Sequence, residues 1–251
     1  LSALINLHDL PLAWLQLKRQ PVRYLVAVTG IGFAALLMFM QLGFQSGLLR
    51  SATTFYQALE TDLILINPAT VNSGSYQQFP QSLLYQALGI EGVSKTIPLY
   101  VTNINAQQLG GVKPTSLRVI GFDPNETVLN VPAINDQRDL IKTPNFVLFD
   151  ELGLTIKTGP VAKRVSKDGP LELILSNYSR SFRVMGLFKL GSTFVADSNL
   201  IASQATALDL AFPQVSVGEI SLGLIRLDPS ANINLVQNYL KSLYGDQLQV
   251  L

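Results

Sequence analysis

The longest apolar stretch of the chain lies between Arg23 and Arg50. The 26 residues of this stretch, Tyr24 to Leu49, include no Lys, Arg, Asp or Glu. A hydrocarbon core about 30 Å thick is crossed by about 20 apolar residues of α-helix, so the stretch predicts a membrane-spanning helix. A cleaved signal peptide is the alternative, but its apolar core is usually about 7 to 15 residues long, which favours a permanent anchor.

The helical pattern of apolar residues continues beyond this stretch. Phe44, Leu48, Phe55 and Leu59 recur at intervals of four and seven residues, which place them on one face of a helix. At 1.5 Å per residue, a helix over residues 22–60 would be on the order of 57 Å long, well beyond the thickness of the hydrocarbon core. We therefore predict that residues 22–60 form a transmembrane helix that leaves the membrane as a stalk with one apolar face.

Small residues within the apolar stretch favour contact with a second helix. Gly43 and Gly47 stand four positions apart, a spacing that lets another helix approach closely. Glycine is also common in lipid-facing membrane helices, so a lipid-facing surface is the alternative. The residues predicted to make helix–helix contact are Gly43, Phe44, Gly47, Leu48, Phe55 and Leu59.

Cations gather on the N-terminal side of the apolar stretch. Lys18, Arg19 and Arg23 precede it closely, whereas the far side has Arg50 and then the acidic residues Glu60 and Asp62. Because cytoplasmic flanks carry the excess of Lys and Arg, the N-terminus is predicted to be cytoplasmic and the main domain to lie outside. Residues 1–21 mix apolar side chains with cations, as interfacial helices do, and we expect Trp14 and the three cations to anchor them at the membrane surface.

Beyond residue 60 the pattern changes to short apolar runs separated by Pro, Gly and Asn. Such runs predict strands, and two longer amphipathic segments that end in glycine predict helices. The predicted strands are 62–68, 93–105, 116–122, 146–151, 219–227 and 247–251, with a hairpin over 171–188. The predicted helices are 80–88 and 232–244, closed by Gly89 and Gly245.

A unit of strand, helix, glycine and strand therefore occurs at each end of the outer region. Two such units packed side by side would form a split α+β layer, with helices on one face of a sheet. The part between them is predicted to be mainly β and to be inserted into this layer. The fold class is thus α+β, with four predicted segments: an interfacial helix 1–21, a membrane helix and stalk 22–60, an α+β lobe 61–124 with 215–251, and an inserted β-rich lobe 125–214.

Composition supports contact with lipid, since 48% of the residues are hydrophobic and 14% are charged, whereas about a quarter are charged in soluble proteins. Lys and Arg number 18 and Asp and Glu 17, and no run of cations exists to track a phosphate backbone, so nucleic acid is not an expected partner. Lys163, Arg164 and Lys167 are predicted to lie in a solvated loop, with an anionic headgroup or partner as the alternative role.

The chain lacks the residues that most catalytic sites require. It has no cysteine and a single histidine, His8, which falls on the predicted cytoplasmic side. The outer region therefore offers no histidine-based triad and no His or Cys metal site, and no HExxH, Walker or dinucleotide motif occurs. We expect no catalytic residue, cofactor or metal, and a membrane-anchored hydrolase with a Ser-Lys or two-carboxylate site is the less favoured class.

Two groups of polar residues in the outer region remain. Asp150 and Glu151 follow a predicted strand, where adjacent side chains point in opposite directions, so they are predicted to form a turn and not a catalytic pair. Asp197, Ser198 and Asn199 are likewise predicted to form a turn.

Several segments of the chain resemble one family of membrane proteins: PLAWLQLKRQPVRYLVAVTGIGFAALLMFMQLGFQ, FYQALETDLILINP, VIGFDP and FKLGSTFVADSNLIAS. The chain resembles the MacB-like permeases of the FtsX superfamily and is most similar to the DevC-type permeases of cyanobacterial exporters. The resemblance implies a MacB-type periplasmic core domain. It covers the whole chain but only part of such a permease, which continues into three more membrane helices. Since the first residue is Leu1 and not Met, we expect a piece of a longer protein.

The resemblance also implies partners and a mechanism. The partners are a second permease copy, a separate ABC ATPase subunit, a periplasmic adaptor and a TolC-like outer-membrane channel, with the permease in the inner (plasma) membrane. ATP binding inside would draw the stalks together, and the outer domains would push cargo, here a heterocyst glycolipid, into the adaptor. The alternatives are another role within the superfamily, such as lipoprotein release, efflux or cell-division signalling, and a single-pass periplasmic sensor.

Overall fold

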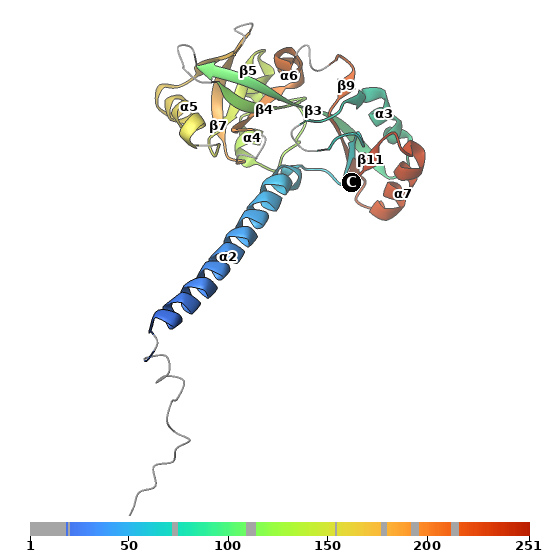
Figure 1. Ribbon diagram of the computed structural model, residues 1–251. Coiled ribbons are helices and arrows are strands. Elements are labelled where there is room, and N and C mark those ends of the chain that lie inside the picture. Colours follow the sequence, from blue (N-terminus) through green and yellow to red (C-terminus); the bar gives the residue numbers. More distant parts are fainter. Residues whose placement is uncertain are drawn as a thin grey trace, which may run out of the picture. The chain divides into compact units, whose positions relative to one another are not determined.

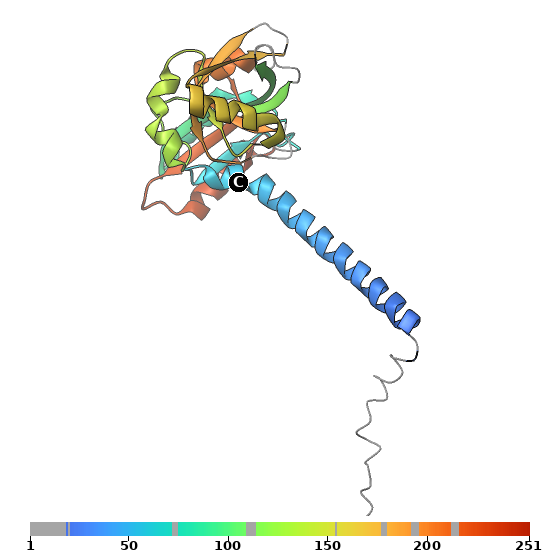
Figure 2. The same ribbon diagram turned by 90° about the vertical axis from the view of Figure 1, so that its left-hand side faces the viewer.

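The structure, a computed structural model, describes residues 19, 21–71, 75–108, 114–153, 155–176, 180–191, 196–211 and 216–251 (Figures 1 and 2). It divides into two compact units, Leu1–Arg50 and Ser51–Leu251. Helix α2, Pro21–Ala58, contributes residues to both. The predicted α+β class, with one N-terminal apolar helix followed by a sheet-rich domain, is confirmed.

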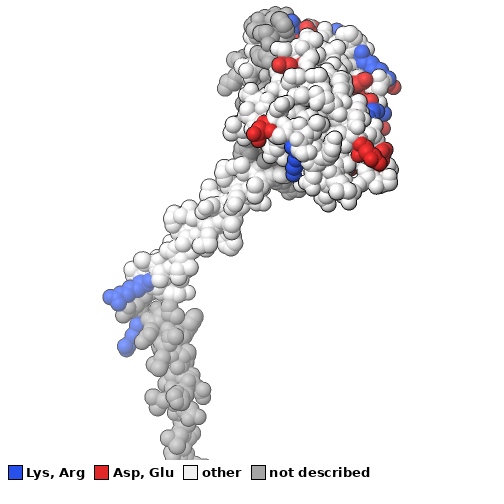
Figure 3. Space-filling view, turned by 90° about the vertical axis from the view of Figure 1, so that its right-hand side faces the viewer, with Lys and Arg blue, Asp and Glu red and all other residues white. Residues whose placement is uncertain are grey.

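The described part of the first unit consists almost entirely of helix α2. The stretch Pro21–Leu49 is long and apolar enough to cross a membrane, and none of its residues is buried. On the face of this part of the helix that Figure 3 shows, charge is confined to the N-terminal end. A helix that is apolar on all sides and unburied is suited to an apolar medium.

The second unit begins with a layer of antiparallel strands covered by helices. Strand β3 pairs with β10 over residues 93–99, β10 pairs with β1, and β1 pairs with β11. A short ladder of β2 and β9 adjoins it. The bounds are β1 Leu63–Ile66, β2 Phe79–Pro80, α3 Gln81–Gln86, 3-10 helix η2 Ala87–Gly89, β3 Val93–Gln108, β9 Glu219–Ile220, β10 Leu222–Leu227, α7 Ile233–Tyr244 and β11 Gln249–Val250.

The remaining strands form a closed ring of pairings in the order β3, β4, β8, β5, β7, β6 and back to β3. The β4–β8 and β5–β7 pairs are parallel and the others antiparallel. The 16 residues of β3 allow it to join both halves, because it changes partner from β10 to β4 at Leu99–Tyr100. The bounds are β4 Thr115–Phe122, α4 Pro132–Asp136, 3-10 helix η3 Arg138–Lys142, β5 Phe146–Asp150, α5 Thr155–Asp168, β6 Leu171–Leu175, β7 Ser181–Phe188, β8 Ser198–Ser203 and α6 Gln204–Ala211.

Two apolar clusters fill the second unit, one on each side of the strands. Alternation along β4 illustrates this, since Leu117 and Val119 join one cluster while Ile120 and Phe122 join the other. All six residues of β8 are buried, as expected for a strand covered on both faces. Apolar residues therefore cover both faces of β4 and β8.

Most strands and helices predicted from the sequence are confirmed, but two predictions are wrong. Lys163, Arg164 and Lys167 lie on helix α5 and not in a loop. This helix forms because Ala162 and Val165 pack into the core, a contact that local sequence does not reveal. Ser198 and Asn199 lie in strand β8 and not in a turn. Both side chains are polar although they are buried, so the sequence pattern did not indicate a strand here.

Candidate functional site: the joint at the end of helix α2

The last turn of helix α2 is buried in the second unit. Phe55 and Leu59 stand four residues apart on one helix face, and their side chains are only 2% and 7% exposed. The backbone then pairs with the loop after β4: Glu60 N donates to Val128 O at 2.8 Å and Asn130 N donates to Ala58 O at 2.8 Å. The helix end is therefore held by apolar contacts and by a short ladder.

A buried arginine lies beneath this last turn. Arg118 of β4 is 1% exposed, and its guanidinium carbon lies 5.6 Å from the centroid of the Phe55 ring, within cation–π range. The hydroxyls of Tyr56 and Tyr76 are 3.0 Å apart. Burial lowers the pKa of Arg118, which Tyr76 and Tyr56 partly oppose, and burial raises the pKa of Tyr76. A buried guanidinium thus lies among aromatic side chains beneath the last turn of α2.

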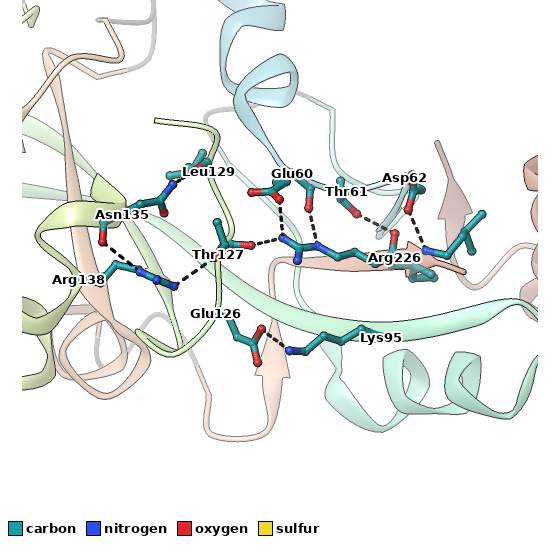
Figure 4. A network of polar contacts seen from close by, with 12 residues as sticks. Glu60, Thr61, Asp62, Lys95, Glu126, Thr127, Leu129, Asn135, Arg138 and Arg226 are labelled. Atoms are coloured by element: carbon teal, nitrogen blue, oxygen red, sulfur yellow. Dashed lines mark hydrogen bonds and ion pairs between the residues drawn. The ribbon is translucent and has the colours of Figure 1, made fainter. Parts of the chain in front are cut away.

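A second arginine holds the residues that follow the helix (Figure 4). Arg226 of β10 donates from Nε to Glu60 O at 2.9 Å and from Nη2 to Thr127 O. Its Nη2 is also 3.8 Å from Glu60 Oε1. Because this ion pair is partly exposed, its charge contributes little, and the bonds to backbone carbonyls are the stronger restraint.

Further polar contacts near Arg226 hold the residues that follow α2 and the loop that follows β4 (Figure 4). Thr61 Oγ1 donates to Ile225 O at 2.9 Å, and Asp62 Oδ2 accepts from Leu227 N at 2.8 Å. On the other side, Lys95 Nζ lies 2.6 Å from Glu126 Oε2, and Arg138 Nη1 donates to Thr127 Oγ1 at 3.2 Å. We call residues 55–62 and 126–130 with Arg118 and Arg226 the joint.

The side chains of the joint connect the end of helix α2 to two neighbouring segments of the second unit. These side chains bond mainly to backbone atoms of β10 and of the loop after β4, so a displacement of the helix end would act directly on both. Among the residues that the structure describes, no three His, Cys, Asp or Glu lie close enough to hold a metal ion.

The structure divides the predicted helix–helix contact residues into two groups. Phe44 is 63% and Leu48 41% exposed, and Gly43 and Gly47 are exposed beside them. Phe55 and Leu59 belong instead to the core of the second unit, where they contribute to the joint. Contact between helices stays a prediction, which we carry forward for the first four residues.

The predicted membrane anchors are only partly described. Trp14 and Lys18 fall outside the described residues, while Arg19 and Arg23 are exposed helical residues. Their role at a membrane surface stays a prediction.

The turn predicted at Asp150 and Glu151 begins at Glu151, because Asp150 is the last residue of strand β5, and Asp150 has a structural role. Asp150 is fully buried, and its carboxylate accepts hydrogen bonds from Leu190 N, Gly191 N and Asn199 Nδ2 at 3.1, 2.8 and 2.8 Å. It therefore fastens the segment after β7 to β8. The contact with Asn199 also explains how a polar residue is accommodated in the buried strand β8.

Among the joint residues that the sequence did not single out are two arginines, Arg118 and Arg226. Arg118 stands in the apolar run SLRVIGF, where a single charge within a buried strand is a signal of a specific partner. Arg226 near the end of its strand carries no comparable signal, because arginines commonly lie at exposed strand ends.

No family model matches the sequence, and no curated protein matches it. Among solved structures, the periplasmic region of MacB from Actinobacillus actinomycetemcomitans is 14% identical, with a TM-score of 0.46 over 75% of this chain and 87% of that one. The extracellular domain of the noncanonic ABC-type transporter YknZ from Gram-positive bacteria is also 14% identical, with a TM-score of 0.46 over 75% and 98% of the two chains. A permease protein domain from Porphyromonas gingivalis is 12% identical, with a TM-score of 0.41 over 77% and 86%.

Proposed function

We propose that this chain is the membrane-anchored outer part of a permease subunit in an ABC-type exporter. The observation that carries the proposal is helix α2, whose stretch Pro21–Leu49 is apolar and unburied while its last turn is locked into the joint. Such a helix provides both an anchor in lipid and a mechanical link to the domain that follows it. The family resemblance of the sequence supplies the class of transporter.

The proposed location is the inner membrane, with the N-terminus in the cytoplasm and the sheet-rich unit in the periplasm. Lys18, Arg19 and Arg23 on the N-terminal side of the apolar stretch support this orientation. ATP hydrolysis would then take place on a separate ATPase subunit inside the cell, and the chain itself would not be an enzyme.

In the proposed mechanism two permease copies approach each other through their membrane helices when the ATPase binds ATP. Gly43 and Gly47 allow close approach, and Phe44 and Leu48 add apolar contact area. The joint passes this movement to β10 and to the loop after β4. The α+β lobe, 61–124 with 215–251, and the β-rich lobe, 125–214, would then push a lipid-like cargo, a glycolipid, into a periplasmic adaptor and a TolC-like channel.

The test uses the complete transporter reconstituted from its parent cell. We expect the double substitution Gly43→Leu with Gly47→Leu to leave ATP hydrolysis measurable while export falls, because bulky side chains keep the helices apart. Val28→Leu is the matched control, since it enlarges an exposed apolar residue elsewhere on the same helix.

Full export by the double variant, at normal membrane levels, would contradict the proposed helix contact. Failure of the full-length protein to copurify with an ATPase would contradict the exporter assignment itself.

A further inference from the structure

A groove lies on the second unit between the turn that precedes β3 and the start of α7. It has a volume of about 770 Å³ and opens to solvent. Its walls come from residues 89–92, from the β10–α7 connection and from the first two turns of α7. None of these residues belongs to the joint, so the groove is a separate feature.

Helix α7 carries an exposed apolar row that lines the groove at Leu235 and Tyr239 and continues beyond it to Leu243. Leu235 is 68%, Tyr239 57% and Leu243 45% exposed, and the three follow one another at four-residue intervals. The neighbouring row of the same helix, Val236, Leu240 and Tyr244, already packs into the core. A surface helix normally turns polar side chains outward next to its buried row, so three large exposed apolar residues indicate a binding surface.

Two carboxylates border the same groove. Glu91 lies in the turn before β3 and Asp228 follows β10, and both are exposed. Neither carboxylate has an ion pair or a side-chain hydrogen bond with any residue that the structure describes. The helix end itself offers no anion site, because Asn232 Oδ1 already accepts from Asn234 N at 3.0 Å and Leu235 N at 3.4 Å.

We infer that this groove docks a segment of a partner protein in which a Lys or Arg side chain stands beside large apolar side chains. The cation would lie between Glu91 and Asp228 and could rest on the Tyr239 ring, while the apolar side chains would cover Leu235. Such an arrangement, an apolar and aromatic centre with charges at the rim, is typical of protein interfaces. The inference holds independently of the proposed function.

The charges disfavour an anionic lipid surface, because Glu91 and Asp228 would face negative headgroups. Figure 3 shows the face that bears α3 and α7 as largely uncharged, with both carboxylates and cations at its margins.

A second copy of the chain is a less suitable occupant. Helix α5 carries exposed Lys163, Arg164 and Lys167, but it lies at the opposite end of the second unit from α7 (Figures 1 and 2). Contact between α5 of one copy and α7 of the next would be head-to-tail and would produce a ring or a filament instead of a closed dimer.

The test measures binding of three synthetic helical peptides, leucine–lysine, leucine–glutamate and serine–lysine, by fluorescence anisotropy. The complete chain is held in nanodiscs of zwitterionic lipid. We expect the leucine–lysine peptide to bind at least about tenfold more tightly than the other two. Leu235→Ser with Tyr239→Ser, and separately Glu91→Gln with Asp228→Asn, should each weaken that binding about tenfold, and the second pair should also reduce its salt dependence.

Two control variants carry matched changes far from the groove. Leu152→Ser removes another exposed apolar side chain, 53% exposed, and Glu172→Gln removes another exposed carboxylate. Both should bind the leucine–lysine peptide as the unaltered chain does. Equal binding of all three peptides, or unchanged binding in the groove variants, would overturn the inference. Binding of dodecylamine that depends on the groove residues, with no peptide binding, would overturn it in favour of a small-molecule site.

Discussion

Arg118 places a guanidinium in the core of the second unit, against the ring of Phe55. We expect Arg118→Ala to lower the free energy of unfolding by about 3 kcal/mol, because the variant loses the cation–π contact and leaves a cavity. Arg118→Met keeps most of the volume without burying a charge and should cost less than about 1.5 kcal/mol. Urea unfolding of the chain in detergent, followed by near-UV circular dichroism, measures both. Equal losses in the two variants would contradict a packing role for the side chain.

Ionisation of Tyr76, whose hydroxyl lies 3.0 Å from that of Tyr56 in the joint, should affect the free energy of unfolding at alkaline pH. Burial, then Tyr56, raises the pKa of Tyr76 above its ordinary value of 10.0. As the pH rises above 10, the unfolded chain therefore loses this proton first, so stability is retained below that pH and falls above it. We expect Tyr76→Phe to reduce the slope of unfolding free energy against pH above 10 by up to about 1.4 kcal/mol per pH unit.

Part of this slope should remain in Tyr76→Phe, since burial also raises the pKa of Tyr244, to about 12. Urea unfolding at a series of alkaline pH values measures the slope. The same slope in Tyr76→Phe and in the unaltered chain would show that Tyr76 ionises equally readily in the folded and the unfolded state.

Among the elements, the close approach of α6 to β4 depends on a glycine. A Cβ added at Gly121 would overlap the Cβ of Ala207. We expect Gly121→Ala to destabilise the second unit by about 1 to 3 kcal/mol, since backbone must shift to make room. Adding Ala207→Gly should recover part of this loss, although glycine within a helix itself costs about 1 kcal/mol.

Thermal unfolding of the single and double variants measures the α6–β4 contact. Gly89→Ala is the control, because a Cβ there meets nothing within 4 Å and should change stability little. A double variant less stable than Gly121→Ala alone would show that Ala207 is not the residue that limits the space.

The elements that the sequence predicts well are those with local signals. Helix α7 has a regular apolar pattern and is capped by Gly245, and β7 alternates buried with more exposed residues, so both follow from short patterns. Helix α5 and strand β8 depend on contacts with distant segments. Their polar residues are typical of loops and turns, so local patterns did not predict these two elements. The exchange of partners along β3 is likewise non-local, since it requires β10, β4 and β6 to be in place.

The same distinction applies to the joint. The apolar spacing of Phe55 and Leu59 predicts that they share a face, but it cannot distinguish a second helix from the core of the same chain. The contacts of Arg226 join residues separated by 99 and 166 positions, and no local pattern reports them. The predicted division into lobes at 124/125 and 214/215 remains a prediction.

At the scale of the whole molecule, the orientation of the chain in the membrane decides which side the sheet-rich unit occupies. The chain contains no cysteine, so a single introduced cysteine reports one position. We expect Ser166→Cys, on the exposed side of α5, to react with a membrane-impermeant maleimide in intact spheroplasts, whereas Ser2→Cys should react only after permeabilisation. The cations before the apolar stretch are the physical reason. The reverse pattern of labelling would place the sheet-rich unit in the cytoplasm, where the proposed export mechanism could not operate.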